Sequence, residues 1–199
     1  MPDERKPDLS LFLDILKTLE RLNVPYMIIG AFAGTVYGIT RVTYDIDIVV
    51  DLSNLHVDAL ANAYPLPRYY ADPQMIRNSI DMGIVFNIID TERGEKADLV
   101  PLAGTPDYRT AFERRVRQLV EIPGADPFDV WCARPEDVIY GKLRAWKEGR
   151  SRKHETDIFE MLFHHYLNTE AHQSILNEED TNQFWQAIKS DARKEADAE

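Results

Sequence analysis

The sequence predicts an α/β fold (more narrowly α+β), in which helices flank a small mixed β-sheet and a helical C-terminal part follows. The first observation is an apolar run at 24–29, a small-residue segment at 31–38 and an apolar run at 48–50, which read as strand, short helix and strand. The second is a β-hairpin, in which residues 83–90 and 96–102 flank a turn with Gly94.

The third observation is a long helix over 135–148, which opens with a proline and two acidic residues, as helices often do. We expect a core domain at 1–133 and a helical part at 134–199. Further helices are expected at 9–22, 53–64, 74–81, 107–117 and from about 155 onward, with short strands at 118–122 and 128–133. The apolar segment 158–167 is expected to be mostly buried.

Composition limits the class of protein. A hydrophobic fraction of 44% and three tryptophans in 199 residues favour a folded chain. The single cysteine, Cys132, excludes an internal disulfide and fits a reducing cytosol, where core packing is its expected role. No secretory leader and no membrane span are expected, so the sequence predicts a cytoplasmic protein. A net charge of −11 argues against wholesale coating of nucleic acid but allows a local basic cleft.

The segment 28–50 carries the chemistry. If the chain is extended from residue 41, then Arg41, Thr43, Asp45 and Asp47 share one face, because side chains alternate along a strand. Two such carboxylates can converge on two cations about 4 Å apart, the arrangement used in phosphoryl transfer. Carboxylate oxygens suit Mg²⁺, and an arginine suits an anionic substrate.

A phosphate site is expected where the first strand ends at Gly30 and Ala31 and a helix begins, because backbone N–H groups are free there. The segment is neither a P-loop nor a GxGxxG motif. The alternatives are structural: Asp-x-Asp is common, the glycines allow close helix packing, and Arg41 is then a surface charge.

The combined pattern GAFAGTVYGITRVTYDIDIVV resembles the signature of the polymerase β-type nucleotidyltransferase superfamily, and more narrowly the minimal bacterial nucleotidyltransferases that include AbiEii-like toxins. The usual opening is Gly-Gly or Gly-Ser, whereas this chain has Gly30-Ala31. Alanine keeps the small size and the N–H group but has less conformational freedom, which affects the fine geometry of the phosphate loop.

Three later residues complete the candidate site. Asp98 is a polar residue in an otherwise apolar strand row, and it is either an exposed strand start or, as the resemblance implies, a third metal-site carboxylate. Lys142 lies among small and apolar residues of its helix, and Asp157 follows in the next helix. The resemblance implies that Lys142 contacts the triphosphate and that Asp157 orients Lys142 or a neighbouring arginine. The alternatives are a surface lysine and a helix-dipole partner.

The resemblance implies transfer of a nucleoside monophosphate from a nucleoside triphosphate, with two Mg²⁺ held by Asp45, Asp47 and Asp98. The expected acceptors are a tRNA end, a small-molecule hydroxyl or a protein, and a toxin would have a cognate antitoxin protein as partner. Two alternatives stay open. One is a catalytically degenerate protein that binds a nucleotide or a partner. The other is a DxD glycosyltransferase. An enzyme of that class needs a nucleotide-sugar domain before the DxD motif that is larger than the 44 residues preceding Asp45.

Overall fold

The computed structural model of the chain describes residues 9–41, 43, 46–120 and 126–167, with the side chains of 165–167 excepted. Seven strands form one sheet in the order β3-β4-β5-β2-β1-β7-β6. The strands are β1 (Tyr26–Ile29), β2 (Asp47–Val50), β3 (Tyr69–Tyr70), β4 (Phe86–Asp90), β5 (Glu95–Pro101), β6 (Val116–Val120) and β7 (Phe128–Cys132). The helices are α1 (Ser10–Arg21), α2 (Gly30–Val36), α3 (Asn54–Ala63), α4 (Pro73–Met82), α5 (Pro106–Glu113), α6 (Pro135–Gly149) and α7 (Arg152–Met161). A 3₁₀ turn spans Leu102–Gly104, and a π-helical segment spans Leu162–Leu167.

The sheet is mixed, as predicted. Strand β2 pairs antiparallel with β1 and parallel with β5, while β1 also pairs parallel with β7. The outer pairs β3–β4, β4–β5 and β6–β7 are antiparallel. Strands β1 and β2 are apolar except for Asp47, as expected for strands covered on both faces, whereas β5 carries charged residues at its start and apolar residues at its end.

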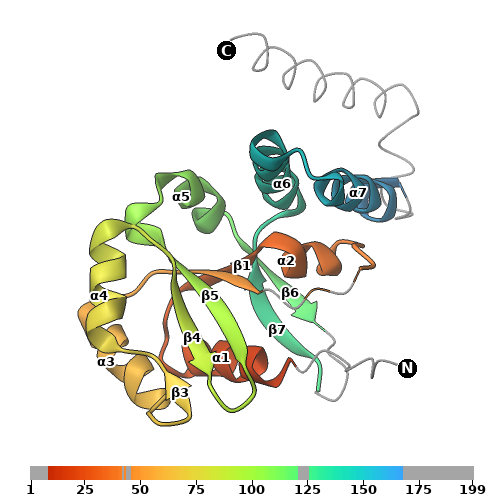
Figure 1. Cartoon of the computed structure of the whole chain (residues 1–199). Coiled ribbons are helices and arrows are strands. Elements are labelled where there is room, and N and C mark those ends of the chain that lie inside the picture. The colour runs from red at the N-terminus through yellow and green to blue at the C-terminus, as the bar shows by residue number, and fades with distance from the viewer. Residues whose placement is uncertain (1–8, 42, 44–45, 121–125, 168–199) are drawn as a thin grey trace.

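The helices cover the sheet through apolar faces. Ile15, Leu16 and Leu19 of α1 are fully buried, which matches the helical spacing of its apolar residues. Ser53 caps α3, because its side chain accepts a hydrogen bond from the N–H group of His56. In Figure 1, α2 lies near α6 and α7. Two ion pairs, Arg114–Asp137 and Arg144–Asp107, connect the region of α5 to α6.

Four sequence predictions need correction. Strand β2 begins at Asp47 and not at residue 41, since Arg41 lies in a bend that brings it to α7. Helix α5 ends at Glu113 and not at residue 117: Arg117 belongs to β6, and both Arg115 and Arg117 stack on Trp131 of β7. The strand β3 was not expected. Helix α7 already begins at Arg152.

The expectation of a mostly buried segment after residue 158 is wrong in part. Ile158, Met161 and Leu162 are buried, whereas Phe159 and Phe163 are 59% and 46% exposed and stack on each other. The domain division at residues 133 and 134 stays a prediction. In the described part of the chain, no helix is long and apolar enough to cross a bilayer.

Candidate functional site

The junction of β1 and α2 carries the first part of the site. Gly30 has φ +69°, a backbone conformation that L side chains rarely adopt, and it opens α2 directly after Ile29. A Cβ atom on Gly30 would overlap Oδ2 of Asp47. Because Ile29 and Asp47 are register partners on adjacent strands, the Asp47 carboxylate lies over the start of α2. The other aspartate of the predicted pair, Asp45, lies outside the described residues.

Asp98 lies beside Asp47. The two are register partners on the parallel strands β2 and β5, about 4.8 Å apart across the sheet, so their side chains point to the same face. Asn87 Nδ2 donates to Asp98 Oδ1 over 2.5 Å, and Lys96 Nζ lies 3.1 Å and 3.3 Å from the two carboxylate oxygens. Sequence analysis missed Asn87 and Lys96, although Lys96 follows from the two-residue period of the strand.

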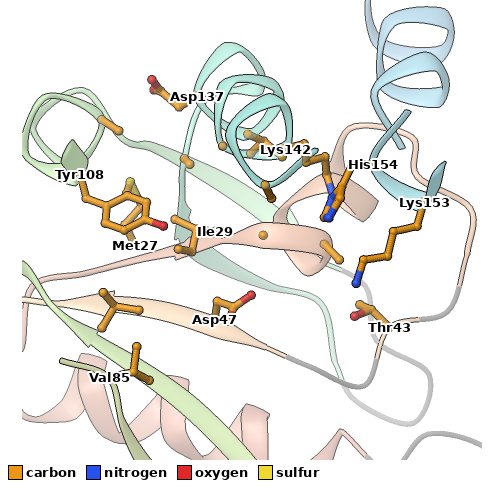
Figure 2. Close-up of a pocket in the computed structure, with 18 of the residues that line it drawn as sticks. Met27, Ile29, Thr43, Asp47, Val85, Tyr108, Asp137, Lys142, Lys153 and His154 are labelled. Carbon is orange, nitrogen blue, oxygen red and sulfur yellow. The ribbon is translucent and has the colours of Figure 1, made fainter. Parts of the chain in front are cut away.

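A cavity of about 390 Å³ opens in front of Asp47. It gathers most of the predicted site residues, namely Gly30, Ala31, Arg41, Thr43, Asp47 and Lys142. Asp98 and Asp157 do not line it. Figure 2 shows Asp47 between two groups of side chains, with Lys142, Lys153 and His154 on one side and Tyr108 and Asp137 on the other.

The buried carboxylate of Asp157 binds two basic side chains that form one wall of the cavity. Arg41 Nε and Nη2 lie 2.6 Å and 2.8 Å from its two oxygens, and Lys142 Nζ lies 2.6 Å from Oδ2. Asp157 is fully buried and Lys142 is 5% exposed. The carboxylate therefore fixes two cations from different parts of the chain at the cavity wall.

The charge states of this group follow from its contacts. Burial alone would raise the pKa of Asp157, but hydrogen bonds from Arg41 and Lys142 outweigh burial and hold the pKa below its ordinary value. Burial lowers the pKa of Lys142, and Asp157 offsets part of that effect. Asp157 is thus a stable anion between two cations.

Three further lining residues were not singled out as site residues from the sequence. Lys153 extends the positive side of the cavity. Burial, followed by Lys153 and Lys142, lowers the pKa of His154, so its imidazole is neutral at pH 7. Burial and the nearby Asp47 raise the pKa of Tyr108. Their positions in the cavity depend on tertiary packing, which the spacing of residues in the sequence does not report.

The donor set at Asp47 and Asp98 suits a magnesium ion. Both groups are carboxylates on adjacent strands, and hard oxygen ligands of this kind are those that Mg²⁺ prefers. Among the described residues, no three His, Cys, Asp or Glu side chains come together as a metal site. The described part of the site therefore supplies two carboxylates, those of Asp47 and Asp98.

Solved structures with a similar architecture were found by comparison. The solution structure of the antibiotic-resistance factor ANT(2'')-Ia has a TM-score of 0.51 at 15% sequence identity, over 96% of this chain and 93% of that chain. The chain has a nucleotidyltransferase fold. A crystal structure of ANT(2'')-Ia with adenylyl-2''-tobramycin gives a TM-score of 0.49 at 17% identity, over 92% and 97% of the two chains. An antigenic nucleotidyltransferase-like protein from Paracoccidioides brasiliensis gives 0.47 at 19% identity, over 77% and 75%.

This nucleotidyltransferase fold is the one that the resemblance to the polymerase β-type superfamily implies. The AbiEii-like subgroup stays a prediction. No protein-family model and no curated protein sequence matches the chain.

Proposed function

We propose that the protein transfers a nucleoside monophosphate from a nucleoside triphosphate to an acceptor hydroxyl. The oxygen of the hydroxyl forms a bond to the α-phosphorus, the bond between that phosphorus and the bridging oxygen of pyrophosphate breaks, and pyrophosphate leaves with the electron pair. The observation that carries the proposal is the position of Asp47, which lies over Gly30 in a cavity with a cationic wall, on a nucleotidyltransferase fold.

Phosphates bind on the cationic side of the cavity. Arg41, Lys142 and Lys153 face the same space, and Gly30 and Ala31 open α2 at its edge. Thr43 adds a hydroxyl to this wall. Because Arg41 and Lys142 are held by Asp157, they are already positioned before the triphosphate arrives, which lowers the entropic cost of binding.

Asp45, Asp47 and Asp98 form the carboxylate set that holds magnesium. Magnesium, when bound, neutralises the charge that develops on the phosphates and on the attacking oxygen. Asp98 takes the proton of the acceptor hydroxyl, and Asn87 fixes the orientation of its carboxylate.

A second candidate function is a catalytically degenerate protein that binds a nucleotide or a partner without turnover. Two observations favour it: Lys96 forms a salt bridge with Asp98, and Ala31 replaces the usual glycine or serine. A tRNA end, a small-molecule hydroxyl and a protein are the acceptors to be compared, and a toxin role with a cognate antitoxin goes with the tRNA acceptor.

The test is a transfer assay with magnesium and each α-labelled nucleoside triphosphate. Total tRNA, a panel of aminoglycosides and the protein alone serve as separate acceptors. The wild type is compared with the Asp45→Asn/Asp47→Asn variant and with Asp81→Asn, an exposed acidic residue of α4 outside the cavity. Label on one acceptor with the wild type and Asp81→Asn, but not with the double variant, supports the transferase. Nucleotide binding without any transfer supports the degenerate protein.

A further inference from the structure

A second cavity of about 590 Å³ opens between α5 and α6. It adjoins the first cavity, because both are lined by Tyr108, Ala111, Asp137, Gly141 and Ala145. Three of these residues are alanine or glycine, and their small side chains leave room between the two helices. A molecule in this groove therefore extends toward the cavity that holds Asp47.

Two ion pairs span the groove and connect α5 to α6. Arg114 donates to both carboxylate oxygens of Asp137, with Nε to Oδ2 at 3.0 Å, and Arg144 Nη1 lies 2.6 Å from Asp107 Oδ2. Asp137 lies in the first turn of α6, and Arg144 follows about two turns later. The two ion pairs lie along the groove and neutralise both of the arginines that line it.

Two further carboxylates of the groove take part in neither of these ion pairs. Glu136 and Glu148 also line it, and neither forms a hydrogen bond or salt bridge with any residue in the described ranges. Four carboxylates and two guanidinium groups give the groove a formal charge of about −2 at neutral pH. Tyr108 and Tyr140 add ring faces and hydroxyls, and Tyr140 is 61% exposed.

The two cavities together have positive charge on one side and negative charge on the other. Lys142 and Lys153 lie on one side of Asp47 and Tyr108 lies on the other (Figure 2). The unpaired Glu136 and Glu148 line the groove, which shares Tyr108 with the first cavity. Asp47, Asp107 and Glu148 all act on the Tyr108 hydroxyl and raise its pKa, after the larger effect of burial. Tyr108 thus lies where the groove meets the catalytic cavity.

We propose that the groove between α5 and α6 is the acceptor site and that its ligand is a small polyhydroxylated cation. This inference rests on the proposed nucleotidyl transfer. Ammonium groups of the ligand pair with Glu136 and Glu148, and rings pack on Tyr140. A hydroxyl at the Tyr108 end reaches the α-phosphate and loses its proton to Asp98, as described above. An RNA backbone would bring phosphates against the unpaired carboxylates, which disfavours it.

The test is calorimetric titration of the full chain with tobramycin, a polyhydroxylated polycation, in the presence of magnesium and a non-hydrolysable ATP analogue. Sucrose, a neutral polyol, is titrated in parallel. The Glu136→Gln/Glu148→Gln variant keeps the shape of the groove and removes both unpaired charges. Asp81→Asn removes a charge of the same kind on α4, away from both cavities.

We expect tobramycin to bind the wild type and Asp81→Asn equally, and the double variant about tenfold more weakly, with sucrose not binding. The affinity for tobramycin falls as salt is raised, and the affinity for the ATP analogue is the same in all three proteins. Equal tobramycin affinity in the double variant, or no tobramycin binding while the analogue binds, overturns the acceptor site alone. Absence of binding by the analogue overturns the proposed function with it.

Discussion

The carboxylate of Asp47 occupies the space that a side chain at position 30 would need. Gly30 has a positive φ and is the first residue of α2, and a Cβ atom built on it would overlap Oδ2 of Asp47. Two residues 17 positions apart in the sequence therefore depend on each other: the glycine leaves the space, and the aspartate fills it.

Gly30→Ala is predicted to displace Asp47. The substitution lowers the free energy of unfolding by about 1 kcal/mol, because alanine is strained in the left-handed backbone conformation of residue 30. The Asp47 side chain rotates away from the new Cβ atom, because the end of that side chain is flexible. Gly94→Ala is the matched control, since Gly94 has φ +70° and nothing lies within 4 Å of the position of its Cβ atom. Urea denaturation should give similar losses for both variants, whereas calorimetry should show weaker magnesium-dependent ATP binding only for Gly30→Ala. Equal ATP binding by both would contradict this role of Asp47.

Asp157→Asn is predicted to destabilise the protein by about 3 kcal/mol, because it leaves the buried Lys142 ammonium and the Arg41 guanidinium without their shared anion. Glu160→Gln is the matched control on the same helix. Glu160 accepts from Thr40 at the surface, so its loss should cost less than about 1 kcal/mol. Urea denaturation of both variants decides the point, and comparable losses would show that Asp157 does not hold this wall together.

His154 is predicted to make the protein less stable as the pH falls below about 6.5. Burial and the adjacent lysines lower its pKa in the folded state, so the unfolded chain takes up the proton first. Stability is therefore full above the ordinary pKa of 6.5 and falls until the pH reaches the lower folded pKa. His154→Gln should flatten the dependence of Tm on pH between about pH 7 and 5. An unchanged slope would contradict the assignment.

Cys132 is predicted to be inert in the folded protein. It is fully buried in β7, and burial raises the pKa of its thiol to about 12. A thiol reagent such as DTNB should give no reaction at pH 7.5 in buffer and one equivalent in about 6 M guanidinium chloride. Reaction at the same rate in both solutions would show that the strand opens readily.

The fold was largely predictable because its elements are strongly periodic. The apolar spacing of α1, the alternation through the hairpin and the proline that opens α6 each gave the element that the structure has. The bend at Arg41 was not predictable, because the residues around position 41 are compatible with both an extended chain and a bend. The contact with Asp157, which is 116 positions away, determines the outcome.

The candidate site was predicted less completely. The motif residues Gly30, Asp47 and Lys142 meet at one cavity, and Asp98 lies beside Asp47. Tyr108, Asn87 and the groove between α5 and α6 depend on how elements pack, and no spacing in the sequence reports that. The roles of all these residues stay predictions until they are tested.

The most direct measurement follows α-labelled and γ-labelled ATP in parallel incubations with magnesium and an acceptor. Nucleotidyl transfer predicts that the α-label becomes covalently attached to the acceptor while the γ-label leaves in pyrophosphate, and that Asp47→Asn loses both signals by at least about a thousandfold. Attachment of the γ-label, or equal transfer by Asp47→Asn, would contradict the proposal that Asp47 holds the metal for attack at the α-phosphate.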